Sequence, residues 1–174
     1  MITIISCTNR NQSISRVVSA YYQSLLAEQN TESNIIDLQG LPKDFVFSAL
    51  YGNAGKNNDF NIYSQQIAQG DKFVFVVPEY NGSFPGVLKA FIDGLEYPSK
   101  FNNKKVAMVG LSSGMQGSAL ALSHLTDILS YLGANLLGMR VKLPRVEANL
   151  KDGKITNDLY NQLLREQVDK LIKF

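Results

Sequence analysis

The sequence lacks the residues that mark secreted, membrane and metal-binding proteins. Its 174 residues include one cysteine, Cys7, one histidine, His124, and no tryptophan. A single cysteine cannot form an internal disulfide, and it excludes a multi-cysteine metal cluster. No apolar run approaches the roughly 18 residues that a membrane-spanning helix needs. Because the amino terminus also has no basic leader, we expect a cytoplasmic protein without a membrane partner.

The chain also lacks a large excess of either positive or negative charge. The chain has 17 lysines and arginines against 15 acidic residues, a net charge of +2, and no long run of either sign. A nucleic-acid-binding surface needs a basic patch or stripe, so we expect no nucleic-acid partner. With 45% hydrophobic and 18% charged residues, the composition is that of a globular protein, and its length predicts a single domain over residues 1–174.

Short β-rich runs alternate with longer helical stretches along the chain. The clearest strand covers residues 72–77, which are apolar on both faces and are followed by Pro78. The pattern predicts strands at 2–6, 33–38, 72–77, 104–110 and 134–143, and helices at 15–29, 58–69, 84–95, 116–132 and 157–173. The stretch from about residue 39 to 57 shows no regular pattern.

This alternation predicts an α/β fold with a doubly wound parallel sheet. Strands without a polar face are typical of parallel sheets that helices cover on both sides, which gives three layers, α/β/α. Right-handed crossovers and five strands favour the strand order 2-1-3-4-5. Ligands of such sheets lie beyond the carboxyl ends of the strands, where the winding reverses between the first and third strands. The loops at 7–15, 78–83 and 111–117 are therefore expected to carry the chemistry.

The first of these loops has the composition of a phosphate-binding loop. It holds Arg10 and three hydroxyl residues, Thr8, Ser13 and Ser15, directly before a predicted helix. Unpaired N–H groups and a partial positive charge at a helix N-terminus suit a phosphate dianion. One serine that merely caps the helix is the simpler alternative, but a cap does not need Arg10. Neither Gly-x-Gly-x-x-Gly nor Gly-Lys-Ser/Thr occurs here, so a terminal monophosphate is favoured over a pyrophosphate.

The loop at 78–83 reads Pro-Glu-Tyr-Asn-Gly-Ser. Asn81-Gly82 alone would predict a hairpin turn. No second strand follows, however, and Pro85 suits the first turn of a helix, which Ser83 is expected to cap. Both a plain turn and a ligand-binding loop therefore remain possible, and we favour ligand contact.

A longer signature begins at this loop. It consists of residues 78–83 followed by Pro85-Gly86, Leu88-Lys89 and Asp93. This signature resembles that of the NADPH-dependent FMN reductase family, which has a flavodoxin-like fold. The first loop agrees in part: Arg10, Ser13 and Arg16 keep the register of the family's Gly-Ser-x-Arg-x-x-Ser-x-x-Arg, but Cys7-Thr8 replaces Gly-Ser. A second departure is Gly94, where the family often has an aromatic residue near subunit contacts or the flavin.

The resemblance implies bound FMN, NADPH or NADH as the electron donor, and a flavin, quinone, azo compound or similar small molecule as the acceptor. It also implies a homodimer or homotetramer. Backbone N–H groups of residues 79–82 would stabilise charge on the reduced flavin. The cofactor-binding residues that it implies are Thr8, Arg10, Ser13, Ser15, Pro78, Glu79, Tyr80, Asn81, Gly82, Ser113, Gly114 and Gln116. The flavin carries the chemistry, so no catalytic side chain and no metal ligand is expected.

Three other interpretations compete with this one. Residues 110–114 match the Gly-x-Ser-x-Gly element of serine hydrolases, but His124 would lie on the order of 18 Å along the next helix from Ser112. A flavodoxin-type electron carrier without NAD(P)H oxidase activity is typically strongly acidic, unlike this chain. A non-redox protein that binds another phosphorylated ligand is the third. Cys7 is expected to be an ordinary buried thiol, and the aromatic residues 45, 47 and 51 to line a subunit interface or the flavin.

Overall fold

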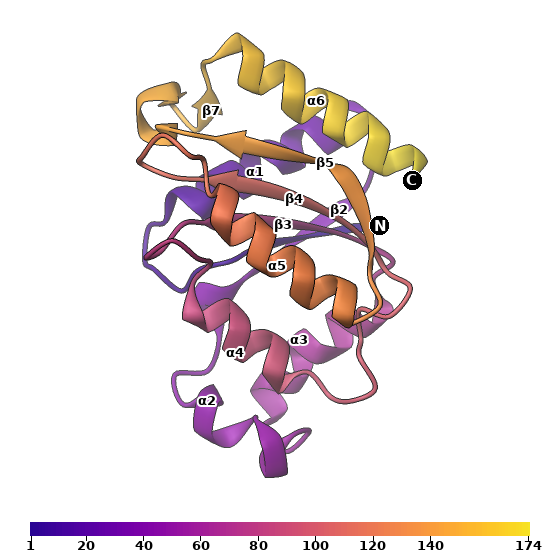
Figure 1. Cartoon of the computed structure of the whole chain (residues 1–174). Helices are drawn as coiled ribbons and strands as arrows, with labels where there is room; N and C mark the ends of the chain where they lie inside the picture. The colour runs from indigo at the N-terminus through magenta and orange to yellow at the C-terminus, as the bar shows by residue number, and fades with distance from the viewer.

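The computed structural model describes residues 1–174, and its centre is a five-stranded parallel sheet (Figure 1). The strands are β1 (Ile2–Ser6), β2 (Ser33–Asp37), β3 (Lys72–Pro78), β4 (Lys105–Leu111) and β5 (Asn135–Leu143). Their order is β2-β1-β3-β4-β5, with every neighbouring pair parallel, and it confirms the order predicted from the sequence.

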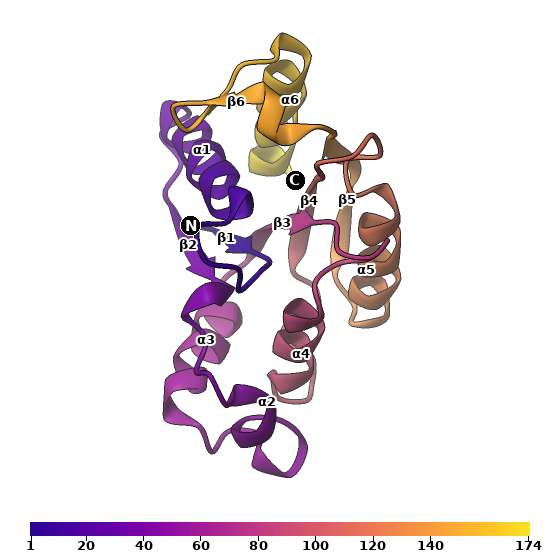
Figure 2. The ribbon, with the colours of Figure 1, turned by 90° about the vertical axis from the view of Figure 1, so that its left-hand side faces the viewer.

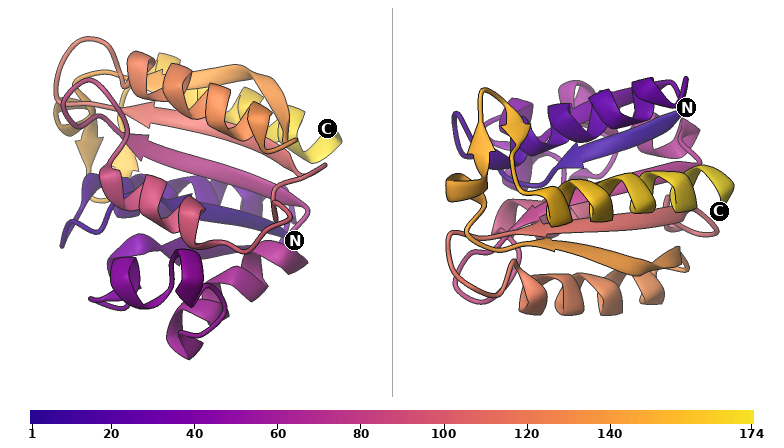
Figure 3. Two further views of the ribbon diagram at one scale, coloured as in Figure 1. Left: turned by 60° about the horizontal axis from the view of Figure 1, so that its bottom comes forward. Right: turned by 90° about the horizontal axis from the view of Figure 1, so that it is seen from above.

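Helices cover both faces of the sheet and complete three layers. Helices α1 (Ile14–Glu28) and α6 (Asp158–Lys173) lie on one face. Helices α3 (Asn58–Gln69), α4 (Gly86–Gly94) and α5 (Ala119–Tyr131) lie on the other, as the two views of Figure 3 show. The flavodoxin-like α/β/α class predicted from strand–helix alternation is therefore the observed one.

Strand β3 packs against helices on both faces of the sheet. Phe73, Phe75 and Val77 pack against α3, α4 and α5, whereas Val74 and Val76 pack against α1 and α6. All five side chains are fully buried. Since each buried apolar side chain of this size contributes about 1.5–3 kcal/mol, the central strand stabilises both layers.

Two predicted helix starts lie too early because loop geometry intervenes. The helix predicted from residue 84 begins at Gly86, after Pro85. The helix predicted from residue 116 begins at Ala119, because Ser118 adopts a left-handed conformation (φ 69°) that cannot belong to a right-handed helix. In contrast, α1 begins at Ile14, one residue before the predicted start.

The pattern missed several short elements. The irregular stretch contains α2 (Phe45–Ser48) between the 3-10 turns η1 (Leu38–Gly40) and η2 (Tyr51–Asn53). After β5, a further 3-10 turn, η3 (Val146–Asn149), leads into the antiparallel pair β6 (Leu150–Lys151) and β7 (Lys154–Ile155). Asp152-Gly153 between these strands is the kind of dipeptide that forms two-residue hairpins, so this signal was present in the sequence.

The carboxyl ends of all five strands meet at one edge of the sheet, which faces the viewer in Figure 2. The loops that follow β1, β3, β4 and β5 gather at this edge and form the candidate site. No helix combines the length and the apolar character needed to cross a bilayer.

Candidate functional site

A cleft of about 100 Å³ opens among these loops. Its lining residues are Arg10, Ser13, Ile14, Ser15, Pro78, Glu79, Tyr80, Leu111, Ser112, Ser113, Val146 and Glu147. Most of the predicted cofactor-binding residues are among them. Segments around residues 10–15, 78–80 and 112–113, which are far apart in the sequence, therefore meet as expected. Larger hollows lie elsewhere; one of about 560 Å³ is formed by the loops that precede β4 and β5, at the opposite edge of the sheet.

The start of α1 supplies an array of unpaired donors. Ser13 is the N-cap, and its hydroxyl accepts the Arg16 N–H at 3.2 Å. The backbone N–H groups of residues 9 and 11–15 make no hydrogen bond within the chain. Ser15 is only 1% exposed, yet its hydroxyl has no partner either. A helix start with this many unpaired donors is suited to an anion.

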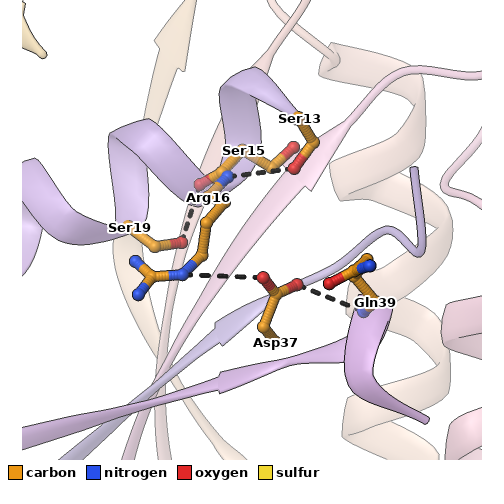
Figure 4. Close-up of polar contacts among 6 residues, drawn as sticks. All are labelled: Ser13, Ser15, Arg16, Ser19, Asp37 and Gln39. Atoms are coloured by element: carbon orange, nitrogen blue, oxygen red, sulfur yellow. Dashed lines mark hydrogen bonds and ion pairs between the residues drawn. The ribbon is translucent and has the colours of Figure 1, made fainter. Parts of the chain in front are cut away.

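The two arginines of the loop differ in availability. Arg16 Nε lies 3.5 Å from an Asp37 carboxylate oxygen at the end of β2, and Asp37 also accepts the Gln39 N–H (Figure 4). Arg10 lines the cleft, is exposed, and forms no ion pair. Of the two guanidinium groups, only that of Arg10 is therefore uncommitted and beside the cleft.

Thr8 and Tyr80 connect the first and third loops. Thr8 Oγ1 lies 2.9 Å from the Tyr80 hydroxyl, and it accepts the Arg10 N–H at 3.2 Å. Thr8 is completely buried, so it lies beneath the cleft rather than in its wall. Two predicted site residues separated by 72 positions thus meet directly.

Residues 80–83 form a tight turn. Tyr80 and Ser83 exchange backbone hydrogen bonds of 2.8 and 3.0 Å, and both central residues have positive φ, 52° at Asn81 and 74° at Gly82. This is the type I′ geometry that Asn-Gly favours. The prediction of a hairpin turn is therefore correct for the backbone, although no long strands extend from the turn. A turn of this kind does not exclude contact with a ligand.

The turn narrows the set of available backbone donors. The Glu79 N–H bonds to the Leu111 carbonyl at 3.1 Å, and the Tyr80 N–H bonds to Ser83. The N–H groups of Asn81 and Gly82 make no hydrogen bond within the chain. The expectation that the N–H groups of all four residues 79–82 face a ligand is therefore wrong for Glu79 and Tyr80, because strand pairing and the turn itself already use them.

Ser83 does not cap α4. The N-cap of α4 is Pro85, which makes no side-chain cap hydrogen bond. The Ser83 hydroxyl instead lies 2.9 Å from His124 Nδ1 on α5. The predicted cap was wrong because Phe84 and Pro85 move the start of the helix two residues beyond the position that a Ser83 cap requires.

Glu79 carries an unsatisfied group at the cleft. Its Oε2 atom is buried and has no hydrogen-bond partner. Buried carboxylate oxygens normally accept hydrogen bonds, so an unpartnered one beside a cleft calls for a donor from outside the chain.

The loop after β4 contributes less than predicted. Ser113 lines the cleft, but Gly114 and Gln116 are exposed and do not. The Gly114 carbonyl accepts the Arg145 N–H at 2.9 Å and the Ser112 hydroxyl at 3.1 Å, which holds this part of the loop against the segment after β5.

The serine-hydrolase interpretation fails, as expected from the sequence. The Ser112 hydroxyl donates to Gly114 and accepts the Gly117 N–H at 2.9 Å, so it is committed within its own loop. His124 bonds to Ser83 instead. No base activates Ser112.

Two lining residues, Val146 and Glu147, lie outside the predicted loops, whereas Ile14, Leu111 and Ser112 fall within the loops at 7–15 and 111–117 that were expected to carry the chemistry. Val146 and Glu147 follow β5, whose carboxyl end shares the same sheet edge. The general rule for such sheets could have indicated this loop, although its residues carry no motif.

Cys7 and Gly94 have structural roles. Cys7 is fully buried, its thiol donates to the Ile5 carbonyl at 3.2 Å, and burial raises the pKa of the thiol well above its ordinary value. A Cβ on Gly94 would lie 2.7 Å from the Phe60 ring. Close packing of Gly94 on Phe60 thus explains why this position holds a glycine and not the aromatic residue that is frequent in the family.

The aromatic residues 45, 47 and 51 divide into two groups. Phe45 stacks on Phe60 in the core, with ring centroids 5.6 Å apart, so its predicted role at an interface or flavin is wrong. Phe47 and Tyr51 are more than three-quarters exposed.

The groups around the cleft fit a flavin mononucleotide. At one end, unpaired N–H groups, the Ser15 hydroxyl and the Arg10 guanidinium are donors of the type that binds a phosphate dianion. At the other end, Tyr80 and the unpartnered Glu79 oxygen lie at the cleft, and the next two residues of the turn, Asn81 and Gly82, do not line it but have unpaired N–H groups. This combination of donors and an acceptor suits the polar edge of a flavin, which has both carbonyl oxygens and an N–H group.

Comparisons with known proteins agree with this fit. The family described as NADPH-dependent FMN reductase matches residues 1–146. A 2-hydroxy-1,4-benzoquinone reductase from a Burkholderia species is 33% identical over 163 residues, 87% of this chain and 83% of that protein. An FMN-dependent NADPH-azoreductase of Staphylococcus saprophyticus is 29% identical over 90% of this chain and 85% of its own length. The solved structure of the NAD(P)H:(acceptor) oxidoreductase FerB from Paracoccus denitrificans shares the fold, with a TM-score of 0.80, 24% identity, and coverage of 99% and 94% of the two chains.

Proposed function

This chain belongs to the NADPH-dependent FMN reductase family, and from that premise we propose that its electron acceptor is a quinone. It is an NAD(P)H-dependent FMN oxidoreductase. The acceptor follows from the relatives: several are named quinone reductases, including the 33% identical Burkholderia protein. A cytoplasmic location is part of the proposal, since a reducing compartment suits a protein with a single cysteine.

We assign the two ends of the cleft to the two ends of FMN. The phosphate end comprises residues 8–15, where Arg10, Ser13, Ser15 and the unpaired N–H groups would hold the phosphate. Thr8 would support it from below. Charge-assisted hydrogen bonds to a dianion are the strongest available here, so this end would supply most of the affinity. The unpaired donors at the start of α1 are the single observation that carries the assignment.

The ring end comprises residues 78–83 and the adjoining loop at 113–116. Pro78, Glu79, Tyr80, Asn81 and Gly82 would border the flavin, with Ser113 in the wall and Gly114 and Gln116 on the exposed rim. When bound, FMN supplies the two-electron chemistry. The chain would contribute the Asn81 and Gly82 N–H groups, which stabilise negative charge beside the ring. No side-chain general base is required.

A homodimer or homotetramer is part of the proposal. A cleft of about 100 Å³ is smaller than the roughly 300–1,000 Å³ of usual ligand pockets, so much of the flavin would extend beyond it. A neighbouring subunit could cover the exposed part and exclude water. Light scattering after size exclusion, with and without FMN, would test this; a monomer in both states would overturn it.

The central experiment is a spectrum of the purified protein, before and after NADPH, followed by acceptor assays. We expect flavin absorption that bleaches with NADPH, and steady NADPH oxidation on addition of 1,4-benzoquinone that exceeds the rate with the azo dye methyl red. A bound flavin that NADPH neither bleaches nor turns over would favour a flavodoxin-type carrier. A colourless protein that does not bind added FMN would overturn the proposal.

A further inference from the structure

The single histidine of the chain is bonded to the turn of the ring end. His124 lies on α5 and is exposed, and its Nδ1 atom is 2.9 Å from the Ser83 hydroxyl. This is the only hydrogen bond of the Ser83 side chain. His124 does not line the cleft.

The turn at residues 80–83 has few other attachments. Its two internal hydrogen bonds close the turn but do not orient it relative to the sheet. Its orientation is set by contacts at its ends, which include the backbone hydrogen bond from the Glu79 N–H to the Leu111 carbonyl at 3.1 Å. At one end, the Tyr80 hydroxyl bonds to Thr8 of the phosphate end at 2.9 Å, and at the other end Ser83 bonds to His124.

The two unpaired donors lie between these attachments. Asn81 and Gly82 are the central residues of the turn, and their N–H groups have no partner in the chain. A Cβ on Gly82 would lie 4.0 Å from the side chain of Leu120, one helical turn before His124. Helix α5 therefore lies beside the turn, and a shift of Ser83 relative to α5 would move both N–H groups.

We propose that His124 is a positioning residue, which holds the turn through Ser83 and so aims the Asn81 and Gly82 N–H groups at the flavin ring. This inference rests on the proposed binding of FMN at this cleft. In neutral histidine, one ring nitrogen is an acceptor and the other a donor. When Nδ1 is the acceptor, Ser83 donates to it; when Nδ1 carries a proton, Ser83 accepts. The bond therefore persists in either state, and His124 acts on the turn without transferring a proton.

The proposal predicts which flavins are affected. Because His124 acts on the ring end, its loss should weaken FMN and riboflavin equally, although riboflavin has no phosphate. A defect in the phosphate end would weaken FMN alone. A general loss of folding would instead lower the melting temperature together with both affinities.

The test measures binding of FMN and riboflavin to flavin-free protein by quenching of flavin fluorescence. We expect His124→Ala and Ser83→Ala each to weaken both flavins about fivefold, the effect of one neutral hydrogen bond. The double variant should be no weaker than either single one, because both remove the same bond. His124→Asn keeps a hydrogen-bonding atom bonded to Cγ, in the position that Nδ1 has in histidine. It should therefore restore binding to within about twofold of the native chain.

Ser123→Ala is the matched control, since Ser123 is exposed on the same helix and its side chain makes no hydrogen bond. It should leave both affinities unchanged. Native affinity in His124→Ala, or additive losses in the double variant, would overturn the proposal.

A second readout needs no flavin. The Tyr80 and Ser83 amides are hydrogen-bonded within the turn, and their hydrogen exchange can be followed by NMR in the flavin-free protein. We expect exchange at both amides to be about fivefold faster in His124→Ala and Ser83→Ala, because the turn opens more often. If the chain bound no flavin but exchange still rose in this way, the proposed function would fail while the anchoring of the turn stood. Unchanged exchange would show that His124 does not hold the turn.

Discussion

The phosphate end and the ring end of the cleft are built in different ways. The phosphate end consists of buried hydroxyl residues and unpaired N–H groups at the start of a long helix; Ser15, for example, is 1% exposed. The ring end is a tight turn on the surface, with Tyr80 36% exposed and Asn81 exposed as well. One end is therefore fixed by the core, whereas the other is attached by the backbone bond of Glu79 to Leu111 and by two side-chain hydrogen bonds.

This difference indicates a division of work. Donors that the fold already holds in place lose little entropy when a ligand binds, so the phosphate end is suited to affinity. An open ring end would leave one side of a flavin bound there accessible to NAD(P)H and then to an acceptor, so it would suit exchange of substrates. Variants at the phosphate end should therefore weaken the binding of FMN alone, whereas variants at the ring end should weaken the binding of both FMN and riboflavin.

Arg10→Ala should have the largest effect and should act on FMN alone. A hydrogen bond between charged groups contributes about 1.5–3 kcal/mol, so the dissociation constant for FMN should rise about thirtyfold while that for riboflavin stays within about twofold. Fluorescence titration measures both. Arg16→Ala is the control, because Arg16 is paired with Asp37, and it should leave FMN binding nearly native. Full FMN occupancy in purified Arg10→Ala would contradict the phosphate assignment.

Gly82→Ala should have the next largest effect and should act on both flavins. Gly82 has φ 74°, which costs other residues about 1–2 kcal/mol, so the turn would adopt other conformations and both affinities should fall by up to about tenfold. Gly153→Ala is a matched control: Gly153 has φ 76° in open space in the turn between β6 and β7. It should lower the melting temperature similarly while leaving flavin binding unchanged. If Gly82→Ala weakened the binding of FMN but not of riboflavin, the assignment of Gly82 to the ring end would be wrong.

Ser15→Ala should have a smaller effect, and like Arg10→Ala it should weaken the binding of FMN but not of riboflavin. The Ser15 hydroxyl makes no hydrogen bond within the chain, so loss of one hydrogen bond to phosphate should weaken FMN about fivefold and spare riboflavin. Ser19→Ala, one turn further along α1, removes a hydroxyl that donates to the Ser15 carbonyl, and it should leave FMN affinity unchanged. Calorimetry with both flavins would measure this. If Ser15→Ala and Ser19→Ala lowered the FMN affinity equally, the cause would be a disturbed helix α1 and not a lost hydrogen bond to phosphate.

The smallest effect is expected at Cys7, which lies directly below the phosphate end. Burial raises the pKa of its thiol, so the reactive thiolate is scarce even in mildly alkaline solution. A chromogenic disulfide reagent should not label the folded protein but should label one thiol after unfolding in guanidinium. Rapid labelling of the folded protein would show that the phosphate end opens readily, against the rigidity inferred here.

Most of the fold could be predicted from the sequence because its signals are local. Buried strands such as β3 are continuous apolar runs, and the hydroxyl-rich loop before α1 has the composition of an anion site. The strand order followed from general rules of handedness. The missed elements, such as α2 and the pair β6–β7, are too short to show periodicity.

The sequence by itself therefore determined the class of sheet and the flavin cofactor, and it predicted the edge at which we place the site. Only the tertiary structure decided which donors remain unpaired: it committed Arg16 to Asp37, used the Glu79 and Tyr80 N–H groups in pairing, and joined Ser83 to His124. The physical reason is that a hydrogen-bonding group is available to a ligand only if no neighbour satisfies it. Those neighbours come from segments that are distant in the sequence and meet only when the sheet assembles.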